Sequence, residues 1–171
     1  DPYEENVRNV REITGIAHAF SAAVEAELGS LDGASGEEPS RFYTDPAQAG
    51  DFVRRTRADA LAVAVGTAHG AYRLPPKLDF DRIGAIAAAA PVPLVLHGGS
   101  GLSDDDFRRA IREGICKVNI FTDLDLAAAA GAREALEAGK NRLTDILPYE
   151  VRSARAVVKE KILLFGSAGK A

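Results

Sequence analysis

The sequence is short of the residues that mark several classes of protein. Its 171 residues include one cysteine, Cys116, and no methionine. A lone cysteine cannot form a disulfide within the chain, which argues against a disulfide-stabilised secreted domain. No apolar run approaches the roughly 20 residues of a membrane span, and no segment has the layout of a signal peptide. These absences predict a soluble globular protein of the reducing cytoplasm.

An excess of charge of either sign is missing too. The chain has 21 Lys and Arg against 25 Asp and Glu, a formal net charge of -4. This balance gives no reason to expect nucleic acid or an anionic membrane as a partner. A chain of this length that is 46% hydrophobic can bury a substantial core. Because it begins Asp1-Pro2-Tyr3 and lacks an initiator methionine, we expect it to be the later part of a longer protein.

Hydrophobic periodicity predicts a strand followed by a helix, repeated four times. Apolar residues at steps of three and four first predict an amphipathic helix over residues 3–20. Short apolar runs predict strands at residues 22–28, 60–65, 92–97 and 115–120. Capping residues and periodicity predict helices at residues 46–57, 78–90, 103–114 and 124–138, with a terminal helix at 148–165.

This alternation implies an α/β fold with right-handed parallel crossovers. Four strands could form a doubly wound domain or half of an eight-stranded barrel. A complete TIM (β/α)8 barrel needs about 250 residues, more than this chain has. We therefore predict that residues 1–171 form a single domain, the C-terminal half of a TIM barrel, with its last four βα units, a preceding helix and a C-terminal helix.

Chemically capable side chains gather at the predicted carboxyl ends of the strands. Glu27 lies at the end of the first strand, His69 follows the second, and His97 ends the third. In parallel α/β folds these ends converge on one face, usually the active face. Two imidazoles at equivalent places, with one carboxylate, make a candidate site for zinc or a similar divalent ion. The alternative, in which each histidine only caps its strand, is favoured for a single histidine but not for this pair.

A run of small residues follows the third strand. Gly98, Gly99, Ser100 and Gly101 precede a predicted helix, so their backbone amides could line an anion and the serine hydroxyl could add a donor. An ordinary tight turn would use the same glycines. The phosphate interpretation is favoured because barrels often hold a phosphate at the loops after their last two strands. Residues 119–122 would form the second of these loops.

Three other titratable residues have weaker claims. Glu37 and Glu38 lie in a Gly- and Ser-rich loop after the first strand and are candidates for a mobile general base. From the residues alone, a solvated acidic loop is the favoured interpretation. His18 lies inside the first helix, away from any loop, and is expected to be structural or solvated.

Several ordered motifs carry a resemblance to a known family. They are V-E-A-E-L-G from Val24, A-V-G-T-A-H-G-A-Y from Ala64, P-K-L-D-F from Pro76, V-P-L-V-L-H-G-G-S-G from Val92, K-V-N-I-F-T-D-L from Lys117 and the closing L-F-G-S-A-G-K-A. Together they resemble class II, metal-dependent ketose-bisphosphate aldolases, essentially from end to end. The resemblance implies an eight-stranded barrel, a homodimer or homotetramer, that reversibly cleaves a phosphorylated sugar such as fructose or tagatose bisphosphate into dihydroxyacetone phosphate and an aldehyde.

The resemblance also implies roles for individual residues. His69 and His97 match two of the three catalytic zinc ligands, and Glu27 matches an acid at a second or alternate metal position. Glu37 or Glu38 matches a loop base. The backbone near Gly70 is expected to meet a monovalent cation, Na⁺ or K⁺. The groups that bind dihydroxyacetone phosphate are matched by Gly70, Gly98, Gly99, Ser100, Asn119, Ile120, Phe121 and Thr122.

The sequence departs from the family pattern at three places. The family's adjacent Asp-His pair, which supplies the catalytic aspartate and the third zinc histidine, does not occur in it. These 171 residues alone are therefore expected to be inactive. The loop between Gly29 and Tyr43 is short, which leaves the choice between Glu37 and Glu38 open. Phe121 stands where fructose-type members carry an aspartate and tagatose-type members a small residue, which leaves the sugar open.

Two alternatives to this function remain at this stage. One is a related barrel lyase that acts on another phosphorylated ketose, such as an intermediate of inositol breakdown. The other is an inactive half-barrel module that binds phosphate through the loop at Gly98.

Overall fold

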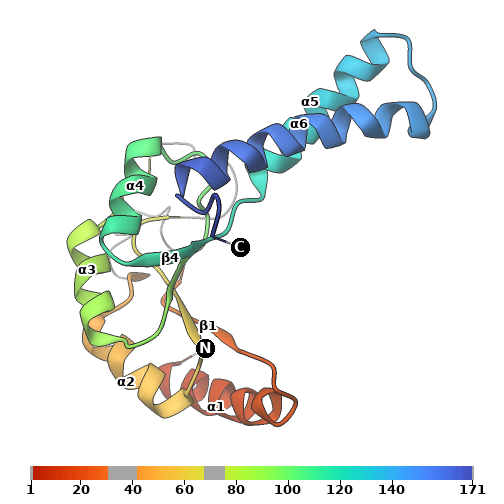
Figure 1. Cartoon of the computed structure of the whole chain (residues 1–171). Coiled ribbons are helices and arrows are strands. Elements are labelled where there is room, and N and C mark those ends of the chain that lie inside the picture. The colour runs from red at the N-terminus through yellow and green to blue at the C-terminus, as the bar shows by residue number, and fades with distance from the viewer. Residues whose placement is uncertain (1, 31–41, 68–75, 171) are drawn as a thin grey trace.

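Four parallel strands and six helices make up the described part of the chain. The computed structural model describes residues 2–30, 42–67 and 76–170. The elements are α1 (Tyr3–Ala19), β1 (Glu25–Leu28), α2 (Pro46–Thr56), β2 (Ala60–Val63), α3 (Phe80–Ala89), β3 (Leu94–Leu96), α4 (Asp104–Arg112), β4 (Ile115–Val118), α5 (Thr122–Glu137) and α6 (Leu143–Leu164). The strands lie in the order β1-β2-β3-β4, all parallel (Figure 1). The predicted α/β fold with parallel strands is confirmed.

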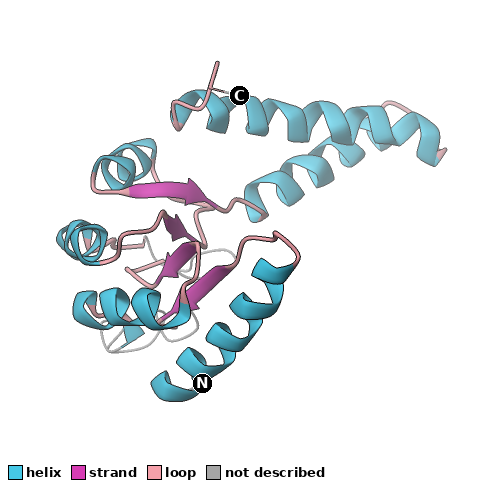
Figure 2. Cartoon of the chain, turned by 60° about the horizontal axis from the view of Figure 1, so that its bottom comes forward, coloured by secondary structure: helices cyan, strands magenta, loops and turns pink. Residues whose placement is uncertain are grey.

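Residue alternation decides which face of the sheet the helices cover. Leu61, Leu94 and Ile115 are buried and join one core with side chains of the helices. Phe52 of α2, Ile83 of α3 and Phe107 of α4 supply the opposing surface of that core, and all three are fully buried. Figure 2 shows α2, α3 and α4 in a row beside the sheet. The opposite face of the sheet carries the charged side chains of β1 and β4.

The strands are shorter than their apolar runs. Only Leu94–Leu96 of the predicted 92–97 is strand, and β4 ends at Val118 instead of residue 120. A residue belongs to a parallel strand only where its backbone forms hydrogen bonds with a neighbouring strand. These hydrogen bonds stop where the loops begin, so the last residues of each apolar run lie outside the strand. The residues released in this way, His97 and Asn119 among them, are the ones assigned to the site.

The terminal helix begins earlier than predicted. The spacing of apolar residues predicts a helix over residues 148–165. It starts at Leu143 and carries Pro148 inside it, so that prediction was wrong. Proline removes one intrahelical hydrogen bond. Packing of α6 along α5 over most of its length holds the helix together across this point.

Helices α5 and α6 form a hairpin that reaches away from the sheet (Figures 1 and 2). They approach each other closely at Gly131 of α5, where an added Cβ would lie 2.6 Å from the carbonyl oxygen of Tyr149. Arg152 and Glu134 form an ion pair across the same hairpin. No residue of α6 is fully buried. The two helices therefore pack along each other, closely at Gly131, without a fully buried side chain on α6.

We expect Gly131→Ala and Gly15→Ala to change stability in opposite directions. The Gly131 variant should lower the free energy of unfolding by about 1–3 kcal/mol, because its methyl group meets backbone that cannot move away alone. Gly15 in α1 has nothing within 4 Å of an added Cβ, so its variant should gain about 1 kcal/mol from helix propensity. Urea denaturation of both variants measures the difference. Equal effects would contradict the close approach of α5 and α6.

The predicted amphipathic character of α1 holds over its first half only. Val7 is buried against the core, and Tyr3 packs on Phe52 with ring centroids 6.2 Å apart. Ile13, Ile16 and Phe20 belong to the apolar spacing that predicted this helix, but they are 57%, 54% and 81% exposed. In the second half of the helix, Thr14 is buried and His18 bonds to Asp59, but these three apolar side chains stay uncovered. None of the described helices is both long and apolar enough to cross a membrane.

Candidate functional site

His97 lies between two carboxylates at the charged face of the sheet. Its Nε2 is 2.9 Å from Oε1 of Glu25, and its Nδ1 is 3.2 Å from Oε2 of Glu27. The second oxygen of Glu25 is 2.6 Å from Nζ of Lys117. Strands β1 and β4 and the end of β3 thus contribute to one polar cluster. His97 and Glu27, both predicted site residues, are brought together by the fold.

Two features of the sheet allow side chains from non-adjacent strands to meet. Glu25 and Glu27 pair in register with Ala60 and Ala62 of β2, so only small side chains separate them from β3. The register also shifts between β3 and β4, where Leu94 pairs with Ile115 but Val95 pairs with Lys117. Simple alternation from the buried Ile115 would place Lys117 on the helix-covered face. Because of the register shift, Cys116 has no partner residue on β3, and the side chain of Lys117 lies on the side of the cluster instead.

The cluster stabilises the ionised form of Glu25. Partial burial would raise the pKa of Glu25, but hydrogen bonds from Lys117 and His97 outweigh it and hold that pKa below its usual value. Glu25 is therefore a carboxylate at neutral pH, and it accepts one hydrogen bond at each oxygen. Such a carboxylate can fix the orientation of the ring beside it.

The donor types in this cluster suit zinc, but the described residues do not complete a site. One imidazole with carboxylate oxygens is chemistry that zinc accepts, and a catalytic zinc usually takes three protein ligands. Among the residues that the structure describes, no group of three or more His, Cys, Asp or Glu is arranged to hold a metal ion. His69 and Gly70, together with Glu37 and Glu38, lie outside the described residues. His97 and Glu27 fit as part of a ligand set, with the rest to come from elsewhere.

The two predicted phosphate segments lie beside each other. Gly99 N–H donates to the carbonyl of Asn119 at 3.3 Å, and the hydroxyl of Ser100 accepts the N–H of Asp123 at 3.2 Å. Ser100 is buried at the start of α5, which begins at Thr122. The loops after β3 and β4 therefore meet at the first turn of a 16-residue helix, whose dipole favours an anion.

Gly99 is required at this junction by close packing. A Cβ there would lie 2.8 Å from Cγ1 of Val118 and 2.9 Å from Cδ1 of Ile120. Gly98 and Gly101 adopt positive φ values of 65° and 86°, which other residues rarely take. The glycines thus serve the tight-turn role that the sequence left open as the alternative. That role is compatible with a phosphate site, because it is what lets the two loops approach.

Phe121 is more exposed than Ser100, another residue at the start of α5 that was assigned to the phosphate site. Its side chain is 74% exposed at the N-terminus of α5, while Ser100 is buried. Lys161 of α6 has its Nζ 3.7 Å from Oδ2 of Asp123 and 5.2 Å from the centre of the Phe107 ring. The base of α6 therefore supports the start of α5, and Phe121 points away from the packed part of the corner.

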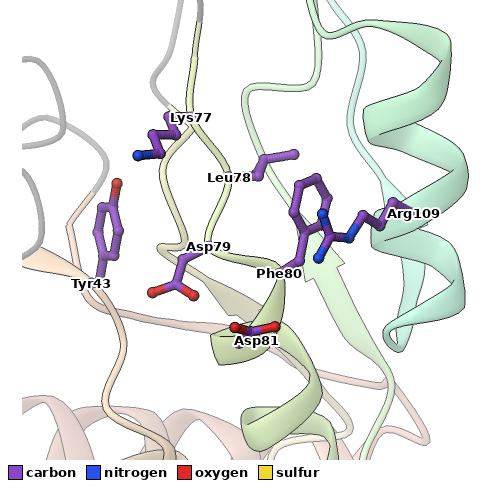
Figure 3. A pocket seen from close by; sticks show the side chains of 7 residues that line it. All are labelled: Tyr43, Lys77, Leu78, Asp79, Phe80, Asp81 and Arg109. Atoms are coloured by element: carbon purple, nitrogen blue, oxygen red, sulfur yellow. The ribbon is translucent and has the colours of Figure 1, made fainter.

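A separate pocket of about 470 Å³ lies at the start of α3 (Figure 3). Arg109 of α4 stacks over Phe80 at 4.1 Å on one side, and Tyr43 and Lys77 line the other. Asp79 caps α3 through the N–H of Arg82 and pairs with its guanidinium at 3.0 Å. These contacts give the P-K-L-D-F motif a structural role. None of the predicted site residues that the structure describes lines this pocket.

His18, expected to be structural or solvated, has a structural partner. Its Nε2 is 2.9 Å from Oδ2 of Asp59, and the same oxygen accepts the N–H of Val24 at 2.7 Å. The hydrogen bond from His18, followed by that from Val24, lowers the pKa of Asp59. The pair joins the turn before β1 to the turn before β2, at the end of the sheet opposite to His97. His18 is therefore no part of the candidate site.

We expect Asp59→Asn to lower the midpoint of urea unfolding at neutral pH and to lose that effect in acid. The pKa of Asp59 is depressed in the folded state, so its contribution is complete above the ordinary value of 3.8 and disappears as the pH falls through the folded value. The measurement is urea unfolding of parent and variant at neutral pH and well below pH 3.8. His18→Gln, which leaves the Val24 bond intact, should show a smaller loss. A difference that persists undiminished in acid would refute the assignment.

Sequence reasoning missed Glu25 and Lys117 as members of the cluster. In the sequence, Glu25 and Lys117 stand out only as parts of family motifs. The available signal was the spacing of Glu25 and Glu27, two residues apart in a strand, which puts both side chains on one face. For Lys117 there was no such signal, because its orientation depends on the register shift against β3.

One family model and three solved structures are similar to this chain. The family model for fructose-bisphosphate aldolase class-II matches residues 1–170. The chain is similar to the YdjI aldolase from Escherichia coli K12, at 40% identity over 100% of this chain and 60% of that one, with a TM-score of 0.87. It is also similar to a protein of Coccidioides immitis assigned as a fructose-1,6-bisphosphate aldolase, at 30% identity over 99% and 61% of the chains, with the same TM-score of 0.87.

A fructose-bisphosphate aldolase of Campylobacter jejuni shares the fold alone, with a TM-score of 0.80 at 21% identity over 97% of this chain and 58% of that one. The chain therefore spans about three fifths of the length of these solved structures. The match to the family model covers almost every residue, and it includes both the polar cluster at His97 and the glycine loop that follows. On these grounds, the chain belongs to the class-II fructose-bisphosphate aldolase family.

Proposed function

We propose that this chain supplies the metal-binding and phosphate-binding part of a zinc-dependent aldolase that cleaves a ketose bisphosphate to dihydroxyacetone phosphate and an aldehyde. The observation that carries the proposal is the position of His97. It ends β3 within a cluster of carboxylates, and the next residues form the loop that meets the N-terminus of α5. A metal ligand and an anion site thus come from one continuous segment.

In this proposal the sheet closes with further strands into a TIM barrel, and the cluster faces its interior. The charged face supports this, because Glu25, Glu27 and Lys117 lie on the side that no described helix covers. His97 and Glu27 would hold the metal together with His69 and a third histidine from outside this sequence. The bound zinc would supply Lewis-acid chemistry at the ketone oxygen of the substrate.

The remaining steps belong to the chain's own groups. The loop of Gly98, Gly99 and Ser100, together with the first turn of α5, would bind the phosphate of the dihydroxyacetone half. Asn119, Ile120, Phe121 and Thr122 would form the second wall of that site, and Gly70 would also bind the phosphate half. Holding the phosphate fixes the reacting carbons relative to the metal, and such positioning lowers the barrier without new chemistry. Glu37 or Glu38 would act as the general base that exchanges a proton on the reacting carbon of the dihydroxyacetone half. A monovalent cation near Gly70 would neutralise part of the phosphate charge.

A homodimer or homotetramer is part of the same proposal. The α5–α6 hairpin exposes large apolar side chains, including Leu143 at 67% and Val151 at 62%. Residues 122–164 carry seven acidic and seven basic side chains, so two copies could approach without net repulsion.

The experiment that tests the proposed function is a cleavage assay of the full-length protein with a panel of phosphorylated ketoses. Dihydroxyacetone phosphate release would be followed for fructose bisphosphate, tagatose bisphosphate and deoxy-keto-gluconate phosphate, before and after zinc removal by a chelator. We expect cleavage of at least one sugar, loss of activity on chelation and recovery with zinc. Cleavage of the gluconate phosphate alone would assign a related lyase. Phosphate binding without any cleavage would assign an inactive module and overturn the proposal.

A further inference from the structure

We infer that Glu25 is a positioning residue which, held in place by Lys117, fixes the ring of His97 so that Nδ1 is the nitrogen presented to the metal. The inference rests on the proposed function and deepens it, since it concerns how one ligand of the proposed site is oriented. Neither Glu25 nor Lys117 would itself touch the substrate.

The argument begins with the two ends of the imidazole ring. Nε2 lies 2.9 Å from Glu25 and Nδ1 lies 3.2 Å from Glu27. An ionised carboxylate can only accept hydrogen bonds, so a ring nitrogen bonded to one must carry a proton. The nitrogen facing Glu25 is therefore the N–H end whenever the other end gives its lone pair to a metal. Histidine ligands generally donate their second N–H to such a partner, which sets the tautomer and the ring orientation.

Glu25, rather than Glu27, is suited to the orienting role. Both oxygens of Glu25 are engaged, one by His97 and one by Lys117 at 2.6 Å, and its side chain is 29% exposed. The Glu27 side chain is 41% exposed and lies at the Nδ1 end, the side from which a metal would approach. Two carboxylates flank one ring, but within the described part of the chain a lysine anchors only Glu25.

Lys117 gives the arrangement its rigidity. It reaches Glu25 across the full width of the four-stranded sheet, from β4 to β1, over the small side chains of Ala60 and Ala62. Its charge offsets the repulsion between Glu25 and Glu27, and its hydrogen bond keeps the Glu25 carboxylate from swinging toward a metal at the other end of the ring. Without the lysine, Glu25 could become a competing ligand.

The test compares zinc binding by the full-length protein and its variants in competition with a chromophoric chelator. We expect Glu25→Gln to weaken zinc binding about 10- to 100-fold, because its single oxygen pairs with Lys117 and leaves an amide donor facing Nε2. Lys117→Met should weaken binding in the same direction but less, and Lys117→Arg should restore it. Glu137→Gln and Lys159→Met, exposed changes of the same chemistry on the hairpin, serve as matched controls and should bind zinc as the parent does.

A second readout separates orientation from simple damage. In the zinc-loaded protein, ¹⁵N chemical shifts of the His97 ring should report metal at Nδ1 and a proton at Nε2, and cobalt substitution should give an altered visible spectrum in Glu25→Gln. Unchanged zinc affinity in folded Glu25→Gln would overturn the inference, as would metal at Nε2 or zinc binding that His97→Ala does not affect. Weakened zinc binding in Glu25→Gln, in a protein that cleaves no sugar, would support the positioning role while the proposed function fails.

Discussion

Replacing His97 by alanine is expected to abolish aldol cleavage while the protein stays folded. If His97 is a zinc ligand, the variant loses the Lewis acid that stabilises charge on the ketone oxygen, a contribution of several kcal/mol. That corresponds to a fall in kcat of about a thousandfold or more. The side chain lies at the edge of the core, bonded to Glu25 and Glu27, and no apolar packing of the sheet depends on it. Steady-state kinetics with zinc analysis of the purified variant measures the effect.

The matched control is His18→Ala, which removes the histidine at the other end of the sheet. It breaks a bond to Asp59 but touches no proposed site residue, so kcat should be unchanged even if stability falls slightly. Full activity in His97→Ala, or equal losses in the two variants, would refute the ligand assignment. Far-UV circular dichroism and the unfolding midpoint of both variants show whether a loss of activity reflects unfolding.

Replacing Phe107 by alanine should cause the largest loss of stability of any single change considered. Phe107 of α4 is fully buried, and its ring packs on Phe165 with centroids 5.0 Å apart. Removing a buried aromatic ring costs about 3–5 kcal/mol through lost burial and the cavity left behind. Stability of a domain is about 5–15 kcal/mol, so the variant should unfold at much lower urea concentration. The loss should affect the attachment of the α5–α6 hairpin, because this ring packs between the base of the hairpin and the sheet.

Phe20→Ala provides the comparison for this prediction. Phe20 has the same side chain but is 81% exposed at the end of α1, so its removal should change the unfolding free energy by less than about 0.5 kcal/mol. Equal losses for the two variants would contradict the packing described. A local loss, in which only α5 and α6 lose amide protection from hydrogen exchange, would instead support the role of Phe107 as the joint between hairpin and sheet.

The sequence could predict those parts of the candidate site that are set by residues adjacent in the chain. His97, Gly99 and Ser100 follow an apolar strand in sequence, and the end of a parallel strand is a site whatever the strand pairs with. Their meeting with residues 119–122 also followed, because β3 and β4 are consecutive and parallel. The start of α6 could not be foreseen, because long-range packing on α5 outweighs the local cost of Pro148.

By itself, the sequence determined the order and type of the elements, the face of each strand that is apolar and the family to which the chain belongs. These follow from short-range periodicity and from motifs, which are local properties of the chain. Only the tertiary structure decided that Glu25 and Lys117 meet at His97. That contact spans four strands and depends on a register shift of one residue at Cys116, and a shift of this size reverses the face on which a side chain lies. No local pattern specifies it, because pairing of β3 with β4 is what fixes the register.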